Sequence, residues 1–182
     1  MKSDLESNSS TRKATANLTL HRHISQYQSK LLKQIPISTI KLSYHPEIPA
    51  KKRIKILGSR QAADILRSLW NPDTLELQEE LKVLFLNNAN QVIGLYPQSV
   101  GSMTSTTVDI RLILSAALNC SAVGFILSHN HPSGKLKPSH KDIQLTHKLQ
   151  SAAKMFDLPL LDHIIITKDD YYSFADHGDL DF

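Results

Sequence analysis

A run of small and apolar residues at 122–127 leads directly into the polar stretch 128–134. A short apolar run that ends in turn residues is typical of a buried strand. In α/β proteins, chemistry is concentrated at the ends of such strands. The polar stretch contains His129 and His131, and the proline and glycine that follow can bend the backbone so that both imidazoles face one point. The stretch therefore predicts a two-histidine site at the end of a buried strand.

A carboxylate follows in the next predicted element. Asp142 lies eleven residues after His131, and Pro138 and Ser139 before it are typical of a helix start. Each piece alone has a simpler explanation, either a solvated His-x-His loop or an acid that stabilises a helix dipole. Together, His129, His131 and Asp142 predict a site for one divalent metal. Two imidazoles and one carboxylate leave a tetrahedral Zn²⁺ one open position for water, as in catalytic zinc sites.

The remainder of the chain alternates predicted strands with amphipathic helices, which is the pattern of the α/β class. We expect Ser59 to cap one helix and Asp109 to begin another. The dipeptide Asp162-His163 is expected to interrupt a strand, and residues 97–107 are expected to form a loop. The expected strands are 37–44, 81–86, 91–96 (a hairpin with the preceding strand), 122–127, 158–161, 164–167 and 171–174, and the expected helices are 60–70, 110–119 and 139–156.

The positive charge of the chain is concentrated at its start. Residues 1–60 hold twelve Lys and Arg against three acids, a net charge of +9, whereas residues 61–182 hold nine against fourteen, a net charge of −5. Residues 1–36 are polar and poor in large apolar side chains, so we expect a basic, largely disordered arm. The arm is either a weak contact for nucleic acid or a solvated tail, and its lack of interleaved aromatic residues favours the tail.

The composition also bears on the compartment. No window approaches the roughly 18 consecutive apolar residues of a membrane span, and the first residues lack the apolar segment of a secretory signal. The single cysteine, Cys120, excludes an intramolecular disulfide and is compatible with a reducing compartment. We therefore expect a cytoplasmic protein without a membrane partner, in which Cys120 is a small buried residue.

At the metal motif the chain resembles a known family. His-x-His, seven residues and then Ser-x-x-Asp is the signature of the JAMM (MPN/JAB) metalloproteases. The words at 129–134, 138–139 and 161–164 resemble the RadC branch of that family. The resemblance runs from about residue 37 to the C-terminus, so we expect 37–182 to form one RadC-like JAB/MPN metal-binding domain. It implies a mixed sheet sandwiched by helices, in the cytidine-deaminase-like three-layer architecture.

The resemblance also implies the rest of a catalytic set. A zinc site with three protein ligands needs a base near its water, and the family places a glutamate just before an apolar strand. Glu79 stands in that place, fifty residues before His129, and Glu80 is the alternative if the register differs by one residue. The family serine, here Ser139, donates a hydrogen bond to the developing oxyanion besides capping its helix. His163 is either a core residue or a partner of a metal ligand, and its apolar surroundings favour the core.

Two functions follow from these features. The first is a zinc-dependent hydrolase of amide or isopeptide bonds, with an unknown peptide or isopeptide substrate. The alternative is a nucleic-acid-associated accessory protein, as the DNA-repair name of RadC suggests, in which the basic arm binds DNA and the metal site is structural or vestigial. The complete ligand set and its candidate base favour the hydrolase.

Overall fold

The computed structural model describes residues 43–100 and 108–180. The predicted arm at 1–36 and most of the predicted strand at 37–44 lie outside the described residues. The expected boundary between arm and domain therefore stays a prediction.

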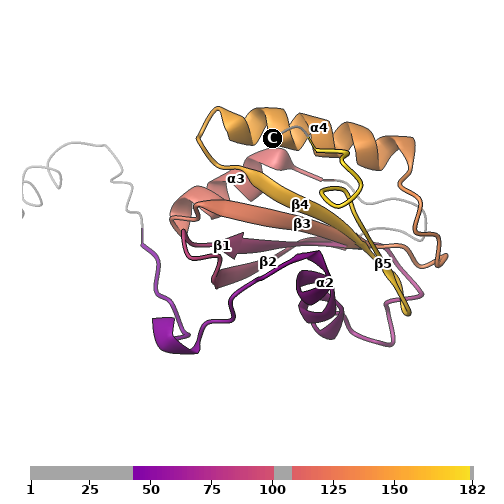
Figure 1. Ribbon diagram of the computed structural model, residues 1–182, viewed down its shortest axis with the longest axis horizontal. Helices are drawn as coiled ribbons and strands as arrows, with labels where there is room; N and C mark the ends of the chain where they lie inside the picture. Colours follow the sequence, from indigo (N-terminus) through magenta and orange to yellow (C-terminus); the bar gives the residue numbers. More distant parts are fainter. Residues whose placement is uncertain (1–42, 101–107, 181–182) are drawn as a thin grey trace, which may run out of the picture. The chain divides into compact units, whose positions relative to one another are not determined.

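A five-stranded mixed sheet forms the centre of the domain (Figure 1). Its strands lie in the order β2-β1-β3-β4-β5. The pair β3–β4 is parallel, whereas the other three pairs are antiparallel. The strands are β1 (Glu80–Leu86), β2 (Val92–Val100), β3 (Gly124–Asn130), β4 (Leu160–Ile166) and β5 (Tyr171–Ser173).

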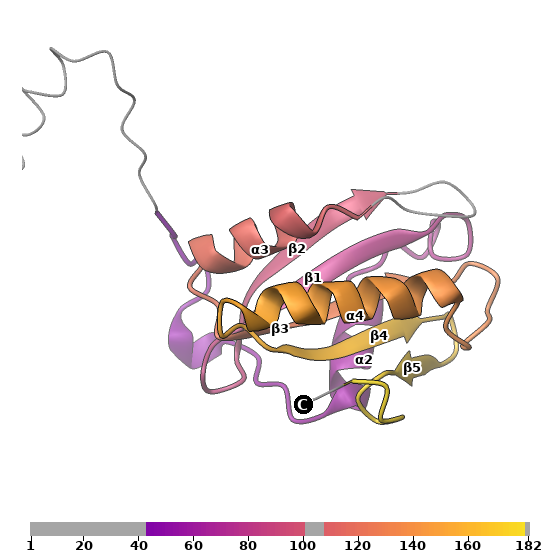
Figure 2. The same ribbon diagram turned by 90° about the horizontal axis from the view of Figure 1, so that it is seen from above.

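Helices cover both faces of this sheet, as expected for the three-layer architecture. Helix α2 (Ser59–Ser68) lies on one face, and α3 (Ile110–Asn119) and α4 (His140–Lys154) lie on the other (Figures 1 and 2). A short 3-10 helix, η1 (Ala50–Lys52), precedes α2. The α/β class with a mixed sheet between helices is thereby confirmed.

Strand alternation divides the core into two halves. On β1, Val83 and Phe85 belong to the cluster that contains the buried faces of α3 and α4. Their neighbours Leu84 and Leu86 belong to the cluster that contains the buried face of α2. Because successive side chains of a strand point to opposite faces, one continuous apolar segment supplies both cores.

The helix starts follow the expected caps in two cases out of three. The Asp109 carboxylate accepts a hydrogen bond from the backbone N–H of Arg111 at 2.9 Å and caps α3. Ser139 caps α4 and forms a capping box with Asp142. The expected cap at Ser59 is wrong, because Gly58 is the N-cap of α2 and Ser59 is its first residue. The Ser59 hydroxyl instead donates a hydrogen bond to the carboxylate of Asp176.

Strands β2 and β3 extend further toward their C-terminal ends than the sequence predicted. Strand β2 continues to Val100 into the expected loop at 97–107, and its position at the edge of the sheet tolerates Pro97, which has no N–H to donate. Strand β3 extends to Asn130, so its last residues are polar and still paired with β4.

Strand β4 runs without the expected interruption at Asp162-His163. It is continuous because both polar side chains have buried partners. The Asp162 carboxylate accepts hydrogen bonds from the Ser173 hydroxyl at 2.7 Å and the Ala175 N–H at 3.0 Å.

Two smaller points concern Cys120 and membrane-spanning helices. Cys120, expected to be buried, is only partly so, and burial raises the pKa of its thiol. Within the described part of the chain, no helix has the length and apolar character required to span a membrane.

Candidate metal centre

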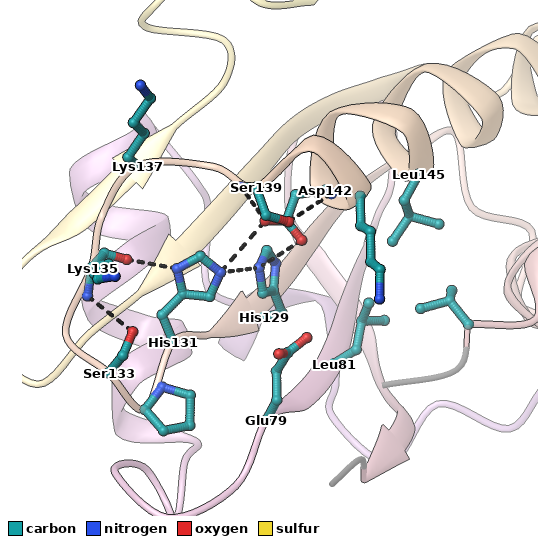
Figure 3. Close-up of a pocket in the computed structure, with 13 residues that line it drawn as sticks. Glu79, Leu81, His129, His131, Ser133, Lys135, Lys137, Ser139, Asp142 and Leu145 are labelled. Atoms are coloured by element: carbon teal, nitrogen blue, oxygen red, sulfur yellow. Dashed lines mark hydrogen bonds and ion pairs between the residues drawn. The ribbon is translucent and has the colours of Figure 1, made fainter. Parts of the chain in front are cut away.

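His129, His131 and Asp142 meet where β3 ends beside the first turn of α4 (Figure 3). The two Nε2 atoms lie 2.9 Å apart. The Asp142 carboxylate is 3.4 Å from Nε2 of His129 and 3.5 Å from Nε2 of His131. The structure thus brings together the three residues that the sequence proposed as ligands, in an arrangement that can hold a metal ion.

Backbone geometry explains why the chain turns at His131. Its N–H donates to the carbonyl of Ile166 at 2.9 Å, which continues the pairing with β4 by one residue. Its carbonyl then accepts from the N–H of Gly134 at 3.0 Å and closes a turn. Gly134 has φ of 72°, a left-handed conformation that favours glycine. The turn brings the chain back toward Lys135, whose carbonyl accepts a hydrogen bond from Nδ1 of His131 at 2.6 Å.

A buried chain of hydrogen bonds orients the other imidazole. The hydroxyl of Thr146 donates to the Asp142 carbonyl at 2.6 Å, so it accepts from Nδ1–H of His163, also at 2.6 Å. Nε2 of His163 is then the acceptor for Nδ1–H of His129, at 2.8 Å. Burial lowers the pKa of His163 well below its usual value and that of His129 to about 4, which keeps both rings neutral.

Both ring nitrogens that face Asp142 are therefore without a proton in the neutral state. The Lys135 carbonyl fixes the proton of His131 on Nδ1, and His163 fixes that of His129 on Nδ1. Two imidazole lone pairs and a carboxylate converge on one point, where a bound cation would relieve their mutual repulsion. Although burial alone would lower it, hydrogen bonds with Asp142 and Lys135 place the pKa of His131 above its usual value.

The dimensions of the triad fit zinc. With bonds of about 2.0–2.1 Å, ligand atoms of a tetrahedral Zn²⁺ lie about 3.3–3.4 Å apart. The two Nε2 atoms are 2.9 Å apart, and each has a different Asp142 oxygen at 3.4 or 3.5 Å. With one atom taken from each residue, the ligand atoms lie within 4.8 Å of one another, so a small adjustment would give this spacing. Although burial disfavours the anion, the interactions with His131, His129 and Ser139 hold the pKa of Asp142 well below its usual range. The carboxylate is therefore ionised and available as a ligand.

The structure separates Glu79 from Glu80. Glu79 lines the cavity beside the triad and points toward the imidazoles (Figure 3). Burial and the nearby Asp142 carboxylate raise the pKa of Glu79 above its usual value. Glu80 instead binds Lys82 and accepts a hydrogen bond from the Thr74 hydroxyl at 2.9 Å. These hydrogen bonds outweigh burial and lower the pKa of Glu80.

Ser139 lies on the opposite rim from Glu79 and performs the expected capping role. Its Oγ accepts a hydrogen bond from the N–H of Asp142 at 3.2 Å, and its N–H donates to the Asp142 carboxylate at 2.6 Å. The Ser139 side chain is also one of the groups that stabilise the ionised Asp142 carboxylate. Glu79, Ser139 and the triad all line one open cavity of about 490 Å³.

The structure assigns supporting roles to three residues that the sequence did not clearly indicate. His163 fits both of its expected roles, because it is buried in the core and also hydrogen-bonded to His129. Thr146 carried a weak signal, since it lies four residues after Asp142 on the same helix face. Asn130 showed no signal beyond its place between the histidines, yet its amide contacts the segment that precedes β1.

Comparison with known proteins agrees with this geometry. A family model described as the RadC-like JAB domain matches residues 56–179. The chain belongs to the RadC-like JAB family. Relatives in this family include proteins named UPF0758 from Flavobacterium johnsoniae, Chlorobaculum parvum and Fusobacterium nucleatum. They are 46%, 39% and 36% identical over 125, 136 and 151 residues, which are 68%, 74% and 82% of this chain.

These RadC-like relatives are longer proteins. The matched regions cover 53%, 60% and 63% of their lengths, so the chain spans about half to two thirds of the curated relatives it matches. Their names state no activity, and any function of the whole relatives is a separate question from that of this JAB domain.

Proposed function

We propose that this RadC-like JAB domain is a zinc-dependent hydrolase of amide or isopeptide bonds. One observation supports the proposal above all others. Three ligand groups converge at the side of an open cavity that also contains a carboxylate, Glu79, outside the ligand set. Structural zinc sites are closed by four protein ligands, whereas catalytic zinc sites keep one position open to water or substrate. An open cavity with a further acid beside the ligands is therefore typical of a catalytic site.

His129, His131 and Asp142 would hold the metal. When bound there, Zn²⁺ supplies Lewis acidity, which lowers the pKa of a water in its open position and polarises a carbonyl group. His163 and Lys135 hold the two imidazoles in the tautomers that present Nε2.

Glu79 acts as the general base and then as the general acid. Its carboxylate faces the triad, and its raised pKa makes it a stronger proton acceptor than an exposed glutamate. One carboxylate oxygen takes the proton of the attacking water. The same proton then goes to the leaving nitrogen, so the amine departs neutral and Glu79 returns to its ionised form.

Ser139 stabilises the negative charge that develops on the carbonyl oxygen. Its Oγ accepts from the backbone of Asp142, which fixes the oxygen at the rim, and its hydroxyl would turn from the Asp142 carboxylate to the substrate oxygen when a metal engages that carboxylate. A fixed donor of this kind acts where charge forms in the transition state.

A hydrolysis screen tests the proposal. Zinc-loaded protein is incubated with pooled peptides and lysine-linked isopeptides, and new amino termini are detected by mass spectrometry. We expect cleavage that a chelator stops and that Glu79→Gln lowers at least about 100-fold, with zinc content unchanged. Glu80→Gln is the matched control and should retain activity. Cleavage that persists in Glu79→Gln or in chelator would contradict the proposal.

The charge of the first residues supports a second candidate. We propose that residues 1–60, with a net charge of +9, make a salt-dependent contact with nucleic acid in the cytoplasm. Removal of residues 1–34, which carry six Lys and Arg against two acids, should then weaken DNA binding and reduce its salt dependence. Equal DNA binding by full-length and shortened protein would exclude this role for the arm.

A further inference from the structure

Three lysines stand around the mouth of the metal cavity. Lys135 and Lys137 belong to the loop after His131, and Lys141 lies in the first turn of α4. All three are exposed. Among the residues described by the structure, none of the three has an ion-pair partner.

The two acids of the cavity neutralise these lysines only in part. Lys141 interacts electrostatically with Glu79, which points toward the imidazoles (Figure 3), whereas Asp142 is engaged with His129 and His131. A metal at the triad would add two further positive charges. The mouth of the cavity is therefore short of negative charge, and a bound substrate is the group that can supply it.

Another part of the cavity wall is apolar. Leu81 comes from β1, Val108 precedes α3, and Leu145 lies one turn beyond Lys141 on α4. Leu145 and Leu81 both face the cavity beside the triad (Figure 3). A ligand that matches both walls carries an apolar side chain next to a negative charge.

A peptide matches this pattern better than a nucleic acid. The cavity of about 490 Å³ is of a size for a small ligand group or a few residues of an extended chain. The basic patch is also local, because residues 61–182 carry a net charge of −5 and would repel a long polyanion. An acidic peptide side chain needs only the few cations at the rim.

We propose that the cavity selects peptide segments in which an acidic residue stands beside an apolar one close to the bond that is cleaved. The selectivity rests on the proposed hydrolase function. Lys135, Lys137 and Lys141 attract the acidic side chain, and Leu81, Val108 and Leu145 contact the apolar one.

Binding of two matched peptides tests the selectivity without turnover. The peptides share one sequence and differ only in Glu against Gln beside a central leucine. They are titrated by fluorescence anisotropy into the Glu79→Gln protein, once zinc-loaded and once zinc-free. We expect the Glu peptide to bind about tenfold more tightly in both forms, with the difference shrinking at high salt.

Variants show whether the lysines cause that preference. Lys137→Gln with Lys141→Gln should reduce the preference to less than about twofold. Lys148→Gln removes an exposed lysine of α4 outside the cavity and should leave it unchanged. Equal binding of the two peptides would overturn the inference. So would a preference that appears only with zinc and survives loss of the lysines, since the acid would then bind the metal directly.

Two further outcomes separate competing explanations. Displacement of the peptides by a short single-stranded oligonucleotide at equal concentration would assign the lysines to nucleic acid and overturn the peptide inference. If the preference holds but the wild-type protein cleaves neither peptide nor the pooled library, the selectivity stands as a binding property and the hydrolase proposal fails.

Discussion

The side-chain oxygen of Asn130 accepts a hydrogen bond from the backbone N–H of Glu80 at 2.7 Å. This contact connects β3, which carries His129, to the segment that carries Glu79. The Asn130 amide also donates to the carbonyls of Leu75 and Gln78, at 2.7 and 2.9 Å. Asn130 itself is fully buried. The residue between the two histidines therefore positions the candidate base across the cavity, through the backbone on either side of Glu79.

Loss of this amide should destabilise the fold. Asn130→Ala leaves one N–H and two carbonyls without their partner, and each unsatisfied buried group costs about 1–3 kcal/mol. We expect a loss of about 3 kcal/mol in the free energy of unfolding, measured by urea denaturation of the zinc-free protein. Asn88→Ala, in the exposed turn before β2, is the control. A loss below about 0.5 kcal/mol, as is usual for surface changes, would show that Asn130 does not hold the segment.

The hydrogen-bond chain behind His129 should set the metal affinity. Thr146→Val keeps the shape of the side chain but removes the acceptor for Nδ1–H of His163, so His129 loses its fixed tautomer. Loss of such support typically lowers metal affinity about 10–100-fold. Competition with a chromophoric chelator measures the zinc dissociation constant. His147→Ala changes the exposed neighbour of Thr146 and should have no effect. An unchanged zinc affinity in Thr146→Val would show that the hydrogen bonds from Thr146 through His163 to His129 serve packing only.

Asp162 should make stability depend on pH. Burial raises the pKa of this carboxyl from 3.8 to about 6, against hydrogen bonds from Ser173 and Ala175 that favour the anion. A carboxyl with a raised pKa in the fold favours the folded state most at low pH, and that contribution is lost as pH rises from about 4 through about 6. Asp162→Asn should therefore gain up to about 3 kcal/mol relative to the wild type between pH 4 and pH 7.5.

Urea denaturation at the two pH values measures this difference. Asp73→Asn, in an exposed turn, is the matched control for the loss of one carboxylate. A difference between Asp162→Asn and wild type that stays constant with pH would contradict the assigned burial cost.

Local sequence patterns were enough to predict the metal ligands, whereas contacts between distant segments could not be predicted from the sequence. His129, His131 and Asp142 lie within fourteen residues, so turn and helix-start signals were enough to bring them together. Asn130 contacts Leu75 at a separation of 55 residues, and no spacing rule reaches that far. The choice between Glu79 and Glu80 likewise required the structure, because a one-residue register step turns a side chain to the other face.

Residue propensities also gave wrong predictions at two places where tertiary contacts satisfy polar side chains. Asp162 and His163 are poor residues for a buried strand, yet β4 is continuous because Ser173 and Thr146 satisfy them from β5 and α4. Ser59 is a good cap residue, but Asp176 offers its hydroxyl a stronger, charged acceptor from the far end of the chain.

Metal analysis of the purified protein shows whether His129, His131 and Asp142 hold one metal ion. Zinc is measured by inductively coupled plasma mass spectrometry after equilibration with a small excess of zinc and removal of the unbound ion. We expect one zinc per chain in the wild type and in the exposed control His140→Ala. We expect less than about one tenth of that in His131→Ala and in Asp142→Ala, because two ligands hold Zn²⁺ poorly. Full zinc content in either ligand variant would contradict the assignment of these three residues as the metal ligands.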